Sequence, residues 1–146
     1  MKTIFDKPTR DELTHRINTL TENSTPQWGK MNVHQMLKHC TLWEELALGR
    51  KHYKRAFIGR IFGKLALKVV LRDTPLKRNT PTIPELRITE NADFSSERAK
   101  WITLIGEHAH PSGLGIDHPF FGKITQDQIG YLVYKHTDHH LRQFNA

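Results

Sequence analysis

The C-terminal stretch 125–146 constrains the fold most strongly, because it predicts a long helix that carries two histidines on its buried face. Thr125 and Gln128 have the spacing of a capping box, which marks the start of this helix. An imidazole on a core-facing stripe is costly unless a partner satisfies it. At 3.6 residues per turn, one face collects these side chains: Ile129, Leu132, Val133, His136, His140 and Gln143.

The two inward histidines have the spacing of metal ligands. His136 and His140 are four residues apart, so their Cβ atoms lie about 5–6 Å apart on a helix. The HExxH zinc motif uses the same spacing, but its glutamate is missing here, because residues 137–139 are Thr, Asp and His. Two interpretations remain open at this point. The histidines either bind a metal ion or are core residues hydrogen-bonded to the backbone or to each other.

A further histidine points inward from the predicted helix 32–48. Asn32 and Gln35 have capping-box spacing, and Gly49 follows as a plausible C-terminal stop. His39 falls at the edge of the apolar arc, whereas His34 points away and is expected to be solvated. The arc consists of Val33, Met36, Leu37, Cys40, Trp43 and Ala47.

With this third imidazole, the sequence predicts a divalent-metal site formed by His39, His136 and His140. Three imidazoles with an open position are the general form of a catalytic zinc site. Zinc or nickel is expected, and manganese or iron also accepts nitrogen and oxygen ligands.

Three neighbouring side chains are candidates to support this site. Gln143 and Gln35 can hold the second N–H of a ligating imidazole. His139 lies about 60° from His136 on the helix, so we expect it either to contact a ligand from outside or to lie at the surface.

Length and composition favour one domain covering residues 1–146, which is long enough to bury a core. The net charge of +7 is compatible with nucleic acid, anionic membrane or acidic small molecules as partners. Cys40 is the only cysteine, which excludes an internal disulfide, and we expect it to be a small core residue. The N-terminal segment has no apolar core of a signal peptide, and no apolar run reaches the roughly 18 residues of a membrane span. These features together predict a cytoplasmic protein.

Residues 51–72 carry a basic stripe, which consists of Arg60, Lys64, Lys68 and Arg72 and repeats every four residues. Three interpretations compete: an amphipathic helix that covers the core, a membrane-surface helix, and a phosphate-binding stripe. Gly59 and Gly63 weaken a helix that lacks tertiary support. We therefore expect the first interpretation, with the apolar side chains on the core.

The remaining segments complete an all-α prediction. Thr9 and Glu12 have capping-box spacing, which predicts a first helix from about residue 9 to the turn at 23–26. Residues 73–94 predict an ordered irregular crossover, and a further helix covers about 95–108. In the following loop, His118 is either a turn residue or a residue at the rim of a pocket near the last helix.

Three segments together resemble the DinB/YfiT-like superfamily, and most closely an uncharacterised bacterial branch of it. The first is the stretch 28–40, WGKMNVHQMLKHC, with the inward histidine. The others are HPFFG at 118–122 and YKHTDHHLRQF at 134–144. With shorter matches at 62–65, 81–82 and 84–86, the likeness covers nearly the whole chain.

This resemblance implies a four-helix bundle with up-down-down-up order, here with an additional amphipathic helix and a long crossover between the second and third helices. It also implies a divalent metal held by three histidines, which map by position to His39, His136 and His140. Superfamily members include thiol-dependent transferases and isomerases, and homodimers are plausible among them. The inserted segment at about 51–90 departs from shorter members and can reshape the pocket.

Two functional hypotheses from different classes follow. In the first, the chain is a metal-dependent transferase or hydrolase that activates water or a low-molecular-weight thiol toward an unidentified small-molecule substrate. Glu44 and Asp138 are the nearest candidates for a general base. In the second, the chain is a non-catalytic binding protein whose segment 51–72 docks on nucleic acid or anionic membrane, although no nucleic-acid motif is present. A metal-stabilised scaffold without another role is a third possibility.

Overall fold

The structure is a computed structural model that describes residues 1–146 and is predominantly helical, as predicted. A two-stranded antiparallel sheet, which the sequence did not predict, lies in the loop before the last helix. In chain order the elements are α1 (Lys7–Thr19), α2 (Val33–Ala47), α3 (Phe57–Val70), the 3-10 helix η1 (Pro84–Leu86), α4 (Phe94–Glu107), β1 (Ile116–His118), β2 (Gly122–Ile124) and α5 (Gln126–Gln143).

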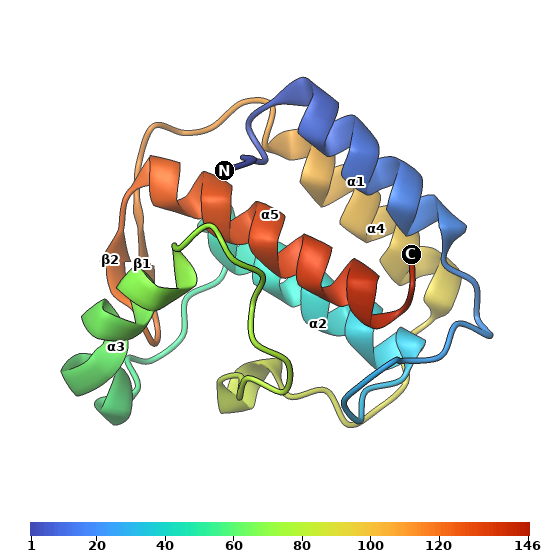
Figure 1. Cartoon of the computed structure of the whole chain (residues 1–146), viewed down its shortest axis with the longest axis horizontal. Helices are drawn as coiled ribbons and strands as arrows, with labels where there is room; N and C mark the ends of the chain where they lie inside the picture. The colour runs from blue at the N-terminus through green and yellow to red at the C-terminus, as the bar shows by residue number, and fades with distance from the viewer.

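Four of the helices surround one hydrophobic core. Helix α2 packs against α4 and α5, and α1 packs against the same two helices (Figure 1). Leu37, Trp101 and Val133 from three different helices are fully buried between them. Cys40 is also fully buried, as expected, and burial raises the pKa of its thiol.

Local capping determines where two of these helices begin. The side chains of Asn32 and Thr125 accept hydrogen bonds from Gln35 N and Gln128 N, so both predicted capping boxes are confirmed. The predicted cap at Thr9 is wrong. Helix α1 begins at Lys7, because a proline suits the first turn of a helix, and Thr9 is already helical and buried.

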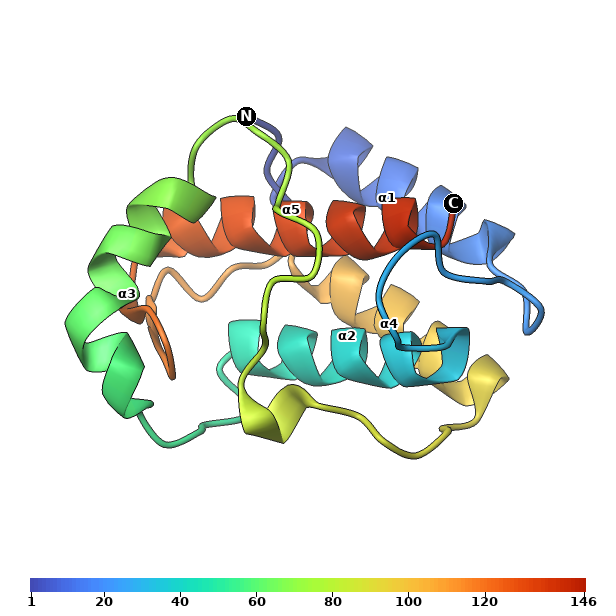
Figure 2. The same cartoon turned by 60° about the horizontal axis from the view of Figure 1, so that its bottom comes forward.

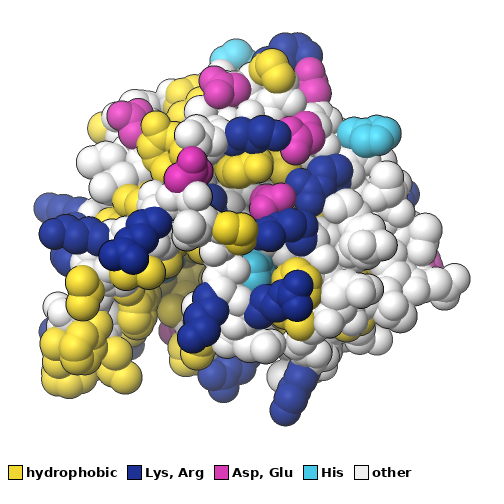
Figure 3. Space-filling model, viewed as in Figure 1, with side chains coloured by type: hydrophobic (Ala, Val, Ile, Leu, Met, Phe, Trp, Pro, Cys, Tyr) yellow, Lys and Arg dark blue, Asp and Glu magenta, His cyan; other side chains and the backbone are white.

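Helix α3 stands apart from the other helices and packs on the hairpin β1–β2 (Figure 1). The expected position of its apolar side chains on the core is wrong. Its buried residues are Gly59, Gly63 and Leu67, while its bulky apolar side chains are exposed and form a yellow cluster in Figure 3. The glycines face the hairpin because a Cβ at either position would lie within 2.4 Å of Phe120 O. No helix of the structure combines the length and apolarity needed to cross a membrane.

The segment between α3 and α4 contains one short element, η1, and crosses in front of α5 and α2 (Figure 2). Ile83, Leu86 and Phe94 are buried and anchor it to the core, which confirms the predicted crossover. This segment therefore covers the side of the molecule on which α2 and α5 meet.

Candidate metal centre

Three histidines from two helices converge beneath the crossover segment. His39 comes from α2, and His136 and His140 lie one turn apart on α5. One ring nitrogen of each lies within 4.8 Å of those of the other two, and the Nε2 atoms of His39 and His136 are 3.0 Å apart. His39 and His140 are buried, and His136 is half-buried. The convergence that the sequence predicted for these three residues is confirmed.

A backbone carbonyl fixes the orientation of His39. Its Nδ1 lies 2.8 Å from the carbonyl oxygen of Leu86, in η1 of the crossover segment. A carbonyl oxygen only accepts, so Nδ1–H donates this bond and Nε2 keeps its lone pair. The lone pair is therefore on the nitrogen that points toward His136.

A side-chain amide fixes His140 in the same way. Its Nδ1 lies 2.9 Å from Oε1 of Gln143, whose Nε2 donates to the carbonyl oxygen of Trp28 at 2.7 Å. Because Nε2 of the amide is committed to Trp28, Oε1 accepts from His140, and the lone pair of His140 is on its Nε2. Gln143 thus occupies the supporting position expected for it. Gln35 does not, since its side chain caps α2 and donates to Thr89 O.

The nitrogen lone pairs of His39 and His140 leave the centre of the triad short of hydrogen-bond donors. An N–H of His136 can donate to only one of these two lone pairs. The Nδ1 of His136 is itself buried without a hydrogen-bond partner. Three imidazole nitrogens around one point are a ligand set for a divalent cation. Tetrahedral zinc places its nitrogen ligands roughly 3.3 Å apart, given Zn–N bonds of about 2.0–2.1 Å, which is close to the spacing of His39 and His136. The residues present therefore fit a metal ion.

Burial keeps all three imidazoles neutral. It lowers the pKa of His39, against the hydrogen bond to Leu86, which raises it. Burial and the neighbouring histidines lower the pKa of His136 well below its usual value, and burial followed by the charge of His39 does the same for His140. A neutral imidazole is the form that binds metals, so protons do not compete for these nitrogens near neutral pH.

Aromatic rings form one wall of the site. The Trp43 ring lies 4.8 Å from the His136 ring and 5.2 Å from the His118 ring. His118 in turn lines a pocket of 340 Å³ together with His52, Tyr53, Arg55, Asp117 and Pro119. His118 also holds a turn, because its Nδ1 accepts from the backbone N–H groups of Phe120 and Phe121. Both interpretations of His118 therefore apply, with Trp43 between it and the triad.

His139 lies behind the triad and is not a surface residue. It is buried, and its ring packs edge-on against Trp28 at 5.5 Å and against His140 at 5.2 Å. The guanidinium group of Arg78, in the crossover segment, stacks over the ring of Trp28 at 4.2 Å. His34 is not fully solvated either, since its Nδ1 lies 3.0 Å from Ala92 O.

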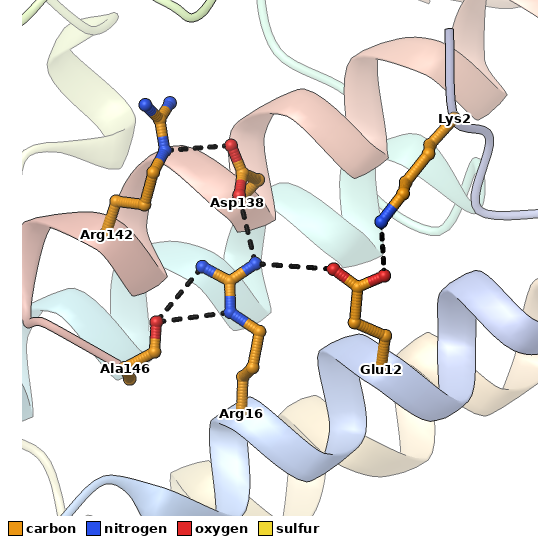
Figure 4. Close-up of polar contacts among 6 residues, drawn as sticks. All are labelled: Lys2, Glu12, Arg16, Asp138, Arg142 and Ala146. Atoms are coloured by element: carbon orange, nitrogen blue, oxygen red, sulfur yellow. Dashed lines mark hydrogen bonds and ion pairs between the residues drawn. The ribbon is translucent and has the colours of Figure 1, made fainter.

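Neither acidic side chain proposed as a general base is free for that role. Glu44 is fully buried, 2.8 Å from His108 Nε2, and accepts from Thr137. Asp138 pairs with Arg16 and Arg142 in a network that joins α5 to α1 (Figure 4). Both carboxylates therefore act in packing.

Sequence reasoning missed the contacts that come from the segments between the α-helices. These are the Leu86 carbonyl, the Trp28 carbonyl and the Arg78–Trp28 stack. No pattern of residue types marks a carbonyl as a partner. Trp43 had a signal, because it follows His39 by four residues and so lies on the same face of α2.

Comparison with known proteins identifies a family but no activity. No curated protein and no solved structure matches the chain at a significant level. Residues 4–146 match a family described as "Protein of unknown function (DUF1569)". Because this match covers nearly the whole sequence, the chain belongs to the DUF1569 family.

Proposed function

We propose that the chain binds one divalent metal ion through His39, His136 and His140. The observation that carries the proposal is the fixed orientation of two imidazoles, each of which donates from Nδ1 to a partner and turns Nε2 to the common centre. Zinc or nickel is the expected ion, and manganese or iron is the alternative. Partners of this kind typically change metal affinity by 10- to 100-fold, so their presence on two of the three histidines favours a metal site over core packing.

The resemblance to the DinB/YfiT-like superfamily supports the same proposal. Two features agree with it: the packing of α1, α2, α4 and α5 around one core, and the origin of the triad from the second and last helices of that set. We infer a DinB-like four-helix bundle of one domain, 1–146, with α3 and the crossover segment as additions to it. We also propose that the protein is cytoplasmic and forms a homodimer.

We further propose that the site is catalytic, as a thiol-transferase-like or hydrolase-like centre for a small molecule. A divalent ion held there would supply Lewis acidity that lowers the pKa of a bound water or small thiol. The chain itself would exclude water from the centre with Trp43, whose ring lies 4.8 Å from the ring of His136. No free carboxylate adjoins the triad, which favours a reaction that needs no separate protein base.

Metal content tests the binding proposal. Elemental analysis of tag-free protein, supplied with zinc, nickel or manganese, should give about one metal per chain. His39→Ala, His136→Ala and His140→Ala should each lose it, whereas His34→Ala and His139→Ala should keep it. If the wild type contains no metal under any of the three conditions, the three histidines are core residues and the metal-binding proposal is wrong.

A substrate panel then tests the catalytic proposal separately. The metal-loaded wild type should turn over a member of a panel of thiol-transfer and hydrolysis substrates, and His140→Ala should not. If the protein binds one metal per chain but turns over nothing in that panel, the metal-binding proposal stands and the catalytic proposal is wrong.

A further inference from the structure

We propose that α3 is an interfacial helix that docks the protein on an anionic lipid surface. The surface shares no residue with the histidine triad. It consists of the basic stripe defined above and an apolar ridge formed by Phe57, Ile58, Ile61, Phe62, Leu65 and Val69.

The apolar ridge is exposed because α3 turns its smallest residues toward the protein. Phe57 is 75% exposed, Ile61 61% and Leu65 64%. On the opposite side, Gly59 and Gly63 contact the backbone of the hairpin so closely that no larger residue fits. Large apolar patches of this kind mark interaction sites in soluble proteins. The large apolar side chains of α3 therefore point to solvent, where only a binding partner can bury them.

Helix α3 is held rigidly on the protein. Ala56 N donates to Pro119 O at 2.9 Å, and Arg55 donates to His118 O at 2.8 Å. At the other end, the ammonium group of Lys135 donates to the carbonyls of Val70 and Arg72, where a cation also favours the helix dipole. The exposed ridge is therefore a fixed feature of the folded chain rather than a helix that has lost its place in the core.

The charge of the chain is concentrated on the same segment. Residues 51–72 contain seven Lys or Arg and no Asp or Glu, and the other residues contain 15 basic and 15 acidic side chains. The whole net charge of +7 thus arises from the segment that carries α3. Lys and Arg side chains border the apolar cluster in Figure 3. An anionic surface is the charge complement of this segment.

The angular arrangement identifies a lipid surface among anionic partners. At about 100° per residue, the ridge spans an arc of roughly 140°, with Lys68 inside it and Arg60 and Lys64 beside it. Arg72 follows the end of α3 at Val70. The apolar ridge and Lys68 therefore point to the same side, whereas the ammonium group of Lys64 donates to Lys123 O of the hairpin at 2.7 Å. A helix at a bilayer surface buries its apolar side chains among the acyl chains and places its Lys and Arg at the lipid phosphates.

Two other partners fit less well. Phosphate contacts on nucleic acid use Lys and Arg and leave no role for an exposed ridge of Phe, Ile and Leu. A second copy of the chain would bury the ridge, but it would bring two basic stripes together, and like charges across an interface are unfavourable.

Vesicle flotation with the full-length protein tests the proposal. The wild type should float with vesicles of phosphatidylcholine mixed with phosphatidylglycerol and not with vesicles of phosphatidylcholine alone. Added salt should weaken the binding, because it screens the basic stripe. Failure to bind the anionic vesicles would overturn the proposal.

Two triple variants separate the contributions of ridge and stripe. Ile58→Ser/Ile61→Ser/Leu65→Ser and Arg60→Gln/Lys68→Gln/Arg72→Gln should each lower partitioning on the order of 100-fold, since each basic residue near an anionic surface contributes about fivefold. Leu114→Ser removes an exposed apolar side chain elsewhere, and Lys7→Gln/Lys30→Gln/Arg87→Gln removes the same number of charges from other surfaces. Both controls should retain binding. Equal loss in stripe variant and charge control would overturn a specific role for α3.

A fluorescent label provides a second measurement that does not depend on lost binding. An environment-sensitive dye on Phe62→Cys should shift to the blue with anionic vesicles, and the same dye on Arg87→Cys should not. Cys40 is fully buried and stays unlabelled in the folded protein.

Two outcomes would identify a different partner for α3. If the protein does not bind vesicles but binds duplex DNA, and this binding needs the basic stripe but not the ridge, the partner is nucleic acid. If the protein does not bind vesicles but forms a dimer that is lost in the ridge variant, the partner is a second copy of the chain.

Discussion

The Nδ1 of His140 lies 2.9 Å from Oε1 of Gln143, and this contact decides which nitrogen of His140 faces the other two histidines. The amide cannot flip without losing its own bond to Trp28 O at 2.7 Å. Trp28, a loop residue 112 positions before His140 in the sequence, thus orients an imidazole of the triad through one glutamine.

Replacing Gln143 should therefore weaken metal binding without removing a ligand. Gln143→Ala should lower zinc affinity by about 10- to 100-fold, because His140 loses the acceptor that fixes its tautomer. Competition with a chromogenic chelator measures this. Gln35→Ala is the matched control, since Gln35 caps α2 and lies off the site, and its zinc affinity should equal that of the wild type. An equal loss of zinc affinity in the two variants would show that Gln143 does not orient His140.

Metal binding should stabilise the folded chain. Zinc at about 100 times its Kd should raise the free energy of unfolding by about 2.7 kcal/mol, because the unfolded chain does not hold the three histidines together. Thermal unfolding with and without zinc measures this gain. His140→Ala should show no gain, and a chelator should return the wild type to its metal-free Tm. An equal gain in His140→Ala would place the stabilising ion elsewhere.

The stability of the protein should depend on His118 in mild acid. Burial, followed by the charge of Arg55, lowers the pKa of His118 from 6.5 to about 3. Below its usual pKa the unfolded chain takes up a proton that the folded chain refuses, so stability is full above pH 6.5 and falls toward pH 3. His118→Asn keeps an acceptor for Phe120 N and Phe121 N but does not titrate.

Denaturant unfolding at a series of pH values tests this dependence. The free energy of unfolding of the wild type should fall more steeply than that of His118→Asn, by up to about 1.4 kcal/mol per pH unit, in this window. Parallel curves for the two proteins would show that His118 takes up its proton in the folded state.

Close packing of α3 on the hairpin predicts opposite effects at two helical glycines. A Cβ at Gly63 would lie 2.2 Å from Phe120 O, so Gly63→Ala should destabilise the protein by about 1–3 kcal/mol. A Cβ at Gly106 in α4 meets nothing within 4 Å, so Gly106→Ala should be neutral or stabilise by up to about 1 kcal/mol. Thermal unfolding of both variants measures the contrast. A neutral Gly63→Ala would mean that α3 does not pack tightly on the hairpin.

The features that the sequence predicted well are those encoded within one helix. Capping boxes depend on residues three apart, and the inward positions of His136 and His140 depend on helical spacing alone, so Thr125, Asn32 and the face of α5 were predicted correctly. At Thr9 the same spacing misled, because a proline one residue earlier already starts α1.

The features that the sequence did not predict depend on contacts between distant segments. The orientation of α3 follows from the approach of Gly59 and Gly63 to Phe120, about sixty residues later, and helical periodicity alone favours an apolar face on the core. Similarly, only the position of Trp28 O distinguishes Gln143 from Gln35 as the partner of a histidine.

X-ray absorption at the zinc edge on the protein loaded with one equivalent of zinc tests the metal site itself. We expect zinc bound by three imidazole nitrogens at about 2.0–2.1 Å with one further light-atom ligand, and loss of one imidazole shell in His39→Ala. A spectrum of fully hydrated zinc, or one with imidazole scattering unchanged in His39→Ala, would contradict a metal centre at His39, His136 and His140.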